Sequence, residues 1–122
     1  MESLSLTALA AEQLALARTA TSGRSAHTVH GGRDHVLRQT LLALAAGHGL
    51  GEHDSPGEAT LQVLLGRVRL TADGESWNGE DGDHVIIPAS RHSLDALDDS
   101  VILLTVAARE AVRGPPLAGK DL

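Results

Sequence analysis

Two histidines, His53 and His92, are the residues of this chain whose spacing indicates a chemical site. Five residues separate His53 from Gly47, and His92 lies in a second glycine-led segment that begins at Gly82. Neutral imidazole nitrogens bind Fe(II), Mn(II), Ni(II) or Zn(II), and they also hydrogen-bond small organic molecules. Three interpretations stay open for the pair: metal ligation, the lining of a metal-free ligand pocket, and ordinary hydrogen-bonded histidines.

The first segment resembles the first sequence motif of the cupin family. That motif reads Gly, five residues, His, one residue, His, three or four residues, Glu, six residues, Gly. Gly47, His53 and Gly66 match it. Ser55 stands in place of the second histidine, and Ala59 stands in place of the glutamate. The resemblance therefore implies a metal site that has lost two of its usual ligands.

The second segment resembles the second cupin motif, which reads Gly, five residues, Pro, one residue, Gly, two residues, His. Gly82 and Pro88 match, and Ser90 replaces the second glycine. His92 stands one residue before the position that the motif gives to its histidine. The resemblance covers about residues 35–107. It implies an all-β protein, a double-stranded β-helix (the cupin jelly-roll barrel), whose motif histidines point into the mouth of the cup. Two protein ligands seldom hold a divalent metal tightly, so a metal centre would need a third ligand.

Residues that could supply a third ligand lie close to the two histidines in the sequence. They are Gln39, His48, Glu52, Glu58, Gln62 and His84. Glu58 is one residue from the family's glutamate position and would reach the site if its strand bulged. Strand parity counts against Glu58 and Gln62, because alternate side chains point to opposite faces and both are out of phase with Ala59. We expect Ser55 and Gln39 to line the pocket, although Ser55 also suits a turn.

The composition limits the class of protein and its partners. The 122 residues are enough for one domain with its own core. The net charge of −6, with one Trp and no Phe or Tyr, argues against a nucleic-acid partner. The absence of cysteine excludes disulfides and thiolate metal sites. No apolar run is long enough for a membrane span and no signal peptide is evident, so we expect a cytoplasmic protein without a membrane partner.

The elements that must position the histidines are a short helix and a series of strands. Residues 5–20 are rich in Ala, Leu, Glu and Gln, which favour a helix. We expect an N-terminal helical extension over residues 1–24, a cupin barrel over residues 25–108, and a flexible C-terminal tail over residues 109–122. The helix is interpreted as a packing or dimer-forming element.

Turn residues divide the rest of the chain into short segments. Residues 35–46 suit helix or strand by composition, and the cupin resemblance favours a strand. Residues 47–58 contain three glycines before a Pro-Gly pair and are expected to form a loop. Asp73-Gly74 is a hairpin turn signal, and residues 100–107 are the clearest buried strand. Further strands are expected over residues 59–71, 75–78 and 84–88.

The other polar clusters are interpreted as surface features. His27, His30 and His35 surround a glycine-rich turn, and the three aspartates of residues 95–99 are expected to form a solvated acidic loop. Trp77 is expected to pack beneath a hairpin. No nucleophile motif and no phosphate-binding glycine loop is present.

Three functions follow from these features. The first is a cupin barrel that binds a small molecule, a divalent metal (Fe, Mn, Ni or Zn), or both. The second is a metal-dependent cupin enzyme of the dioxygenase or isomerase type, which the missing ligands weaken. The third is a non-catalytic structural or regulatory accessory protein. The cupin resemblance implies a homodimer in each case, formed through the N-terminal helix or an edge strand, because open sheet edges need covering.

Overall fold

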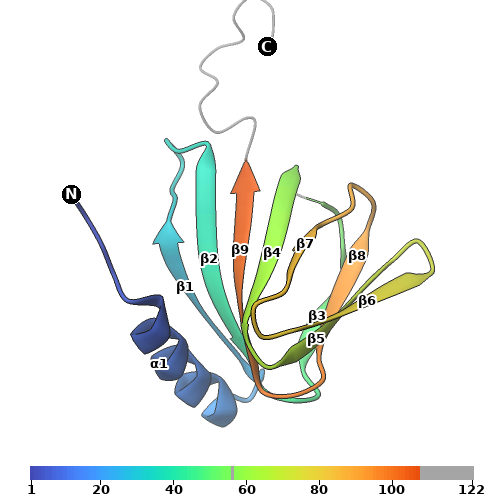
Figure 1. The fold of residues 1–122 in the computed structure, drawn as a ribbon, viewed down its shortest axis with the longest axis horizontal. Coiled ribbons are helices and arrows are strands. Elements are labelled where there is room, and N and C mark those ends of the chain that lie inside the picture. Colours follow the sequence, from blue (N-terminus) through green and yellow to red (C-terminus); the bar gives the residue numbers. More distant parts are fainter. Residues whose placement is uncertain (56, 108–122) are drawn as a thin grey trace, which may run out of the picture.

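The computed structural model describes residues 1–55 and 57–107, which form one helix followed by nine strands (Figure 1). The elements are α1 (Leu6–Thr19), β1 (Arg24–His30), β2 (Leu37–Leu44), β3 (Gly49–His53), β4 (Glu58–Leu65), β5 (Arg67–Ala72), β6 (Glu75–Glu80), β7 (His84–Ile86), β8 (His92–Ala96) and β9 (Ser100–Ala107). The predicted all-β architecture with a short N-terminal helix is confirmed.

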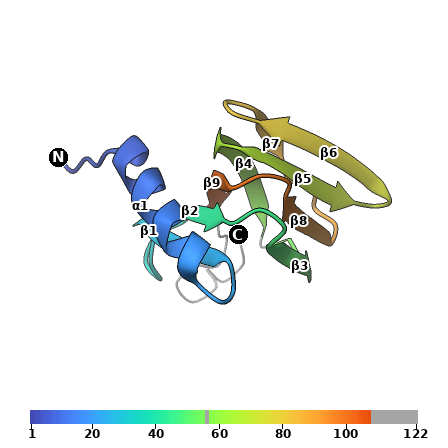
Figure 2. The same ribbon diagram turned by 90° about the horizontal axis from the view of Figure 1, so that it is seen from below.

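The strands form two antiparallel sheets that pack against each other as a jelly roll. The first sheet has the order β1-β2-β9-β4-β7, and the second has the order β3-β8-β5-β6. From β2 onward the chain crosses repeatedly between the sheets, so that β7, β8 and β9 lie in the first, second and first sheet. Figure 2 shows the two sheets as opposite walls, with the second sheet on the side away from α1.

The buried members of the core between the sheets are all aliphatic, since the chain has no Phe or Tyr and its one Trp is only half-buried. These buried members are Leu44, Ala59, Leu61, Val63, Val68, Leu70, Ile87, Leu94, Ala96 and Ile102. Burying each of the larger side chains contributes about 1.5–3 kcal/mol. Half-buried Trp77 packs against this cluster from the β5–β6 hairpin, as expected.

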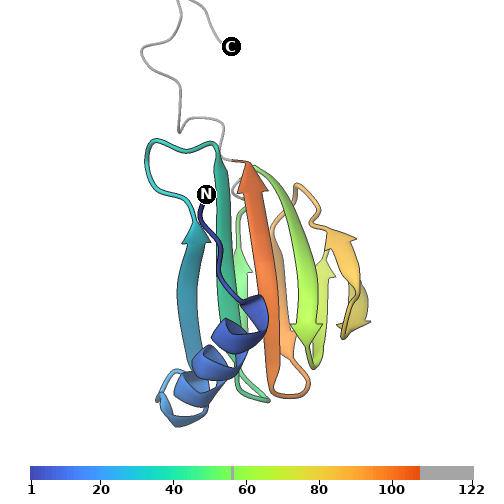
Figure 3. The same ribbon diagram turned by 60° about the vertical axis from the view of Figure 1, so that its left-hand side comes forward.

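Helix α1 covers part of the outer face of the first sheet (Figure 3). The Ser5 hydroxyl caps the helix by accepting a hydrogen bond of 3.1 Å from the Ala8 N–H. Ala10, Leu14 and Ala17 pack on Leu41, Ala43 and Val101 in a second buried cluster. Strand β2 therefore carries apolar side chains on both faces, one for the core and one for the helix. This explains why residues 35–46 lack the alternation of a half-exposed strand.

The sequence-based expectation of a loop over residues 47–58 was wrong, because β3 forms there. One of its two glycines, Gly49, serves close packing in place of a turn. A Cβ on Gly49 would lie 2.1 Å from the Leu94 backbone oxygen, so only glycine lets β3 approach β8. The partner strand β8 was also missed, although His92, Leu94 and Ala96 are buried and alternate with more exposed residues. Asp95 lies in this strand and not in an acidic loop.

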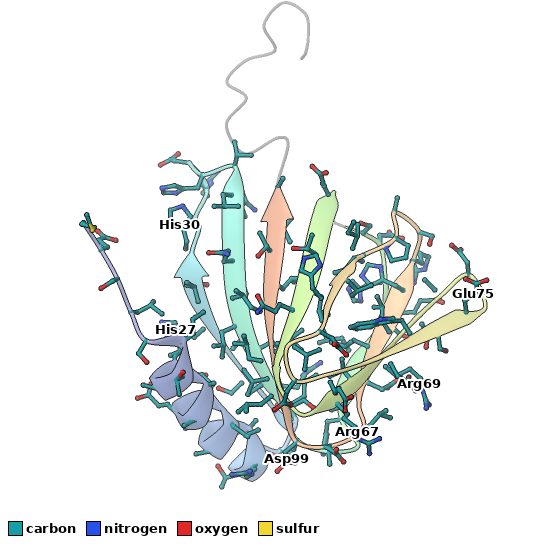
Figure 4. The ribbon with its side chains drawn as sticks, in the orientation of Figure 1. His27, His30, Arg67, Arg69, Glu75 and Asp99 are labelled. Carbon is teal, nitrogen blue, oxygen red and sulfur yellow. The ribbon has the colours of Figure 1, made fainter. Side chains whose placement is uncertain are left out.

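Strand β1 was also missed, since His27 and His30 were interpreted only as surface residues around a glycine-rich turn. It is an edge strand that pairs with β2 alone, so most of its side chains are exposed. The predicted surface histidines His27 and His30 lie on it (Figure 4), and both are exposed. The turn at Asp73-Gly74 joins β5 to β6, as predicted.

The division into extension, barrel and tail stays a prediction. Helix α1 packs directly on the barrel, and the expected flexible tail lies outside the described residues. Among the described residues, no helix has the length and apolar character that crossing a membrane requires.

Candidate functional site

A cavity of about 220 Å³ lies between the two sheets, and both predicted histidines line it. Its lining residues are Leu50, His53, Asp54, Leu61, Leu70, Ile87, His92, Leu94, Ile102 and Leu104. Seven of these ten side chains are Leu or Ile. For comparison, an apolar cavity of about 150 Å³ is enough to hold benzene. The cavity therefore has room for a small organic molecule with a hydrocarbon body.

Strands β3 and β8 bring the two histidines together. His53 and His92 are direct partners across the antiparallel pair, and their ring centroids lie 4.4 Å apart with an angle of 67° between the rings. His92 is buried, with 3% exposure, whereas His53 is half-buried. The pair thus extends from the interior of the barrel toward its surface.

An irregularity in β3 selects His53 as the residue opposite His92. Leu50 pairs with Leu94, so a regular register would place Glu52 opposite His92. The register instead shifts by one residue, and His53 takes that place. A β-bulge of this kind re-aims the side chains that follow it.

Backbone carbonyls fix the protonation pattern of both imidazoles. His53 Nδ1 lies 2.8 Å from the Gly51 oxygen, and His92 Nδ1 lies 3.0 Å from the Ser90 oxygen. A carbonyl oxygen only accepts hydrogen bonds, so each Nδ1 carries a proton that it donates. In the neutral rings, each Nε2 then holds a free lone pair, and neither has a hydrogen-bond partner within residues 1–55 and 57–107. This tautomer is the one in which histidine commonly binds a metal or accepts a hydrogen bond.

The side chains present do not fit a tightly held divalent metal. Across the described part of the chain, no group of three or more His, Cys, Asp or Glu side chains is placed to hold one. Ala59, at the glutamate position of the motif, is buried in the aliphatic core. The Ser55 hydroxyl donates a hydrogen bond of 2.9 Å to the Gly57 oxygen. Among the residues that line the cavity, only His53 and His92 have side-chain nitrogens that could bind a metal.

The other sequence-predicted candidates are not among the residues that line the cavity. Glu58 is exposed on β4, out of phase with buried Ala59, as strand parity predicts. Ser55 and Glu58 border a separate surface hollow. Gln39 borders another surface hollow, together with residues 2–4 and Leu6 at the start of α1. Its amide nitrogen donates a hydrogen bond of 3.2 Å to Thr105 Oγ1.

Two charged residues at the cavity were missed by the sequence analysis. Asp54 lines the cavity, with an 80% exposed side chain, so it marks the open end. Arg91 Nη1 lies 3.1 Å from Asp54 Oδ1, and Arg91 Nε lies 3.4 Å from Glu52 Oε1. These charges directly flank His53 and His92 in the sequence. That juxtaposition was the signal that could have identified the pair.

No protein-family model matches this sequence, and no curated protein is similar to it in sequence. Solved structures do match its fold. A cupin superfamily protein from Desulfitobacterium hafniense aligns with a TM-score of 0.64 and 16% identity, covering 69% of this chain and 76% of that one. An RmlC-like cupin from Desulfovibrio desulfuricans gives 0.61 and 24%, covering 70% and 82%. The chain is a cupin-fold domain.

A third solved structure with a similar fold is that of a larger protein, an enzyme. The salicylate 1,2-dioxygenase of Pseudaminobacter salicylatoxidans aligns with a TM-score of 0.67 and 23% identity. The alignment covers 84% of this chain but only 32% of the dioxygenase. At this level of identity the match concerns the shared fold.

Proposed function

We propose that this cupin-fold protein binds a small organic molecule in the cavity between its sheets. The aliphatic wall would contact the hydrocarbon part, and His53 and His92 would contact the polar part. The observation that carries this proposal is the adjacent pair of imidazoles, each with its Nε2 lone pair free, in a cavity whose other lining side chains are Leu and Ile except for Asp54. His92 is buried, and a buried polar group without a partner costs about 1–3 kcal/mol, so its Nε2 favours a ligand that satisfies it.

A divalent metal is a second candidate for the same position. The tautomer of both histidines favours it, because each presents Nε2 and donates from Nδ1 to a carbonyl. Fe, Mn, Ni and Zn all accept imidazole ligands. With two protein ligands we expect weak binding that is lost on dialysis. A metal-dependent enzyme of the dioxygenase or isomerase type is the catalytic form of this second candidate.

A ligand screen by thermal unfolding tests the binding proposal. The comparison is between the wild type, the His53→Ala/His92→Ala variant, and a His27→Ala/His30→Ala control. The control removes two exposed histidines from β1, which lies at the far edge of the first sheet from β7 (Figure 4). A ligand present at about 100 times its Kd stabilises the folded state by about 2.7 kcal/mol.

We expect at least one compact ligand to raise the melting temperature of the wild type and of the control but not of the site variant. Equal shifts in all three proteins would refute the site assignment. Elemental analysis of the same preparations separates the second candidate. About one metal per chain, measured before dialysis and absent from the site variant, would favour the metal-dependent enzyme instead.

A further inference from the structure

The polar side chains that line the cavity are all hydrogen-bond acceptors when the histidines are neutral. The Nδ1 protons of His53 and His92 are already donated to carbonyls, so each ring offers only Nε2 as an acceptor. The third polar lining residue is Asp54, whose carboxylate accepts but does not donate. The other seven lining side chains are Leu or Ile. A bound molecule therefore meets three acceptors and no side-chain donor.

Arg91, the cation that pairs with Asp54 at the cavity mouth, is already held by acidic residues 52 and 54. Its Nη1 contacts Asp54 Oδ1 at 3.1 Å, its Nε contacts Glu52 Oε1 at 3.4 Å, and its Nη2 contacts the Glu52 carbonyl at 3.4 Å. One cation is shared here by two carboxylates, those of Glu52 and Asp54, so this group of three side chains keeps a net negative charge that disfavours a carboxylate ligand. Unfavourable contacts of this kind exclude a ligand as effectively as a poor shape.

We infer that the ligand of this cavity is a primary amine, bound as its ammonium ion, on a compact hydrocarbon body. The inference rests on the proposed function, which is small-molecule binding in the cavity. An ammonium group has three N–H donors, which match the two Nε2 atoms and the Asp54 carboxylate in number. Because Asp54 is largely exposed, the ammonium would lie at the open end of the cavity, where it keeps part of its hydration. The hydrocarbon body would fill the aliphatic part, whose size suits one ring or a short branched chain.

Four compounds that share one skeleton test the head group. They are cyclohexylmethylamine, cyclohexylmethanol, cyclohexanecarboxylate and methylcyclohexane, titrated in the presence of EDTA so that no bound metal contributes. Trp77 reports binding by its fluorescence: it is the only Trp in a chain without Tyr, and it pairs with Leu70, which lines the cavity.

We expect the amine to bind at least about tenfold more tightly than the carboxylate, and the alcohol to fall between them, because hydrogen bonds to charged groups are the stronger ones. Carboxylate binding equal to or tighter than amine binding would overturn the amine inference while leaving the cavity as a binding site. Failure of all four compounds to bind would instead count against the proposed function, and with it this inference.

Two substitutions at the cavity mouth test the part played by charge. Asp54→Asn should weaken amine binding by about tenfold and leave alcohol binding within about twofold, because only the amine carries a charge. Arg91→Met frees Asp54 from its ion pair and should strengthen amine binding. The matched control is Arg69→Met, which removes the same charge from exposed Arg69 on β5, where it bonds Asn78 (Figure 4). Equal losses for amine and alcohol in Asp54→Asn, or equal effects of Arg91→Met and Arg69→Met on amine binding, would overturn the inference.

Discussion

Each of the two site histidines is oriented by its own strand. His53 bonds the carbonyl of Gly51 and His92 bonds that of Ser90, in both cases two residues earlier in the chain. The tautomer of the pair therefore depends on local backbone geometry and not on the charged neighbours Asp54 and Arg91. Substitutions of those neighbours should change the electrostatics of the cavity mouth while leaving both Nε2 acceptors in place.

Ser100 shows how strongly this small barrel depends on single buried polar groups. Its fully buried hydroxyl accepts a hydrogen bond of 3.1 Å from the backbone N–H of Arg67. It donates one of 2.7 Å to the backbone carbonyl oxygen of Asp98. Ser100→Ala leaves the Arg67 N–H without its partner. We expect a loss of about 1–3 kcal/mol in the free energy of unfolding, measured by urea denaturation.

The control for this prediction is Ser76→Ala. Ser76 is exposed on β6 and its hydroxyl pairs with that of Thr71 at 3.3 Å. Its removal should change the free energy of unfolding by no more than about 0.5 kcal/mol. Similar losses in the two variants would show that the buried hydroxyl has no special part in joining β5 to β9.

At the residue scale, motif spacing and strand parity predicted the histidine pair and the outward direction of Glu58 and Gln62, and both residues are exposed on β4. Sequence reasoning missed Asp54 and Arg91. Their adjacency to His53 and His92 was a signal, but which neighbouring side chains reach the cavity depends on the register of β3 against β8. A one-residue shift in that register decides which side chains reach the cavity. Such irregularities leave no periodic signal in the sequence.

At the element scale, strands β3 and β8 form the polar end of the cavity. Strand β3 was not predicted because glycine is a strong signal for a turn, whereas Gly49 and Gly51 lie within a paired strand. What makes this segment a strand is its non-local pairing with β8, which a local pattern does not contain. By contrast, strands β4 and β9 were anticipated from the local pattern of their apolar residues, whereas β2 was ambiguous by composition and was anticipated only through the cupin resemblance.

Gly49→Ala tests whether close packing of β3 on β8 holds the histidines together. The new Cβ would meet the Leu94 backbone oxygen at 2.1 Å, and backbone atoms cannot rotate away. We expect a loss of about 1–3 kcal/mol in stability from overpacking, together with weaker binding of any ligand of the wild-type cavity. Thermal unfolding and ligand titration measure the two effects.

Gly51→Ala is the matched control in the same strand. A Cβ at Gly51 has no neighbour within 4 Å, and its backbone is not in the left-handed region. This variant should retain the stability of the wild type or gain slightly, because glycine weakens a strand. If Gly51→Ala proved as damaging as Gly49→Ala, close approach to β8 would not be the reason for the glycine.

At the scale of the whole molecule, the cupin fold is retained while the usual metal ligands are not. The resemblance of two spaced motifs to the cupin family was enough to predict the barrel, and the motif glycines Gly47, Gly66 and Gly82 all have positive φ angles, which suit turns. The chemistry of the cavity differs because Ala59 extends the aliphatic core where the motif has a carboxylate. The result is a barrel whose interior is suited to hydrocarbon and whose polar end is limited to three acceptors.

The connection between helix and barrel should make the whole molecule sensitive to acid. Asp99 accepts a hydrogen bond of 2.8 Å from the Ala46 N–H and pairs with Arg18 Nε at 2.7 Å, near the end of α1 (Figure 4). These two interactions, in that order, hold the pKa of Asp99 below its ordinary value of 3.8. A carboxyl whose pKa is lower in the folded state adds stability above its unfolded pKa and loses it as the pH falls through the folded pKa.

We therefore expect Asp99→Asn to be less stable than the wild type near neutral pH and the difference to shrink as the pH falls below 3.8. Urea midpoints between about pH 7 and about pH 2.5 measure this difference. The control is Glu75→Gln, which removes a charge from exposed Glu75 beside the β5–β6 turn, where it makes no ion pair within the described residues (Figure 4). Its offset from the wild type should not follow the same course. A constant difference between wild type and Asp99→Asn across the range would mean that the amide retains the contacts of the carboxylate, and that Asp99 joins helix and barrel by hydrogen bonding alone.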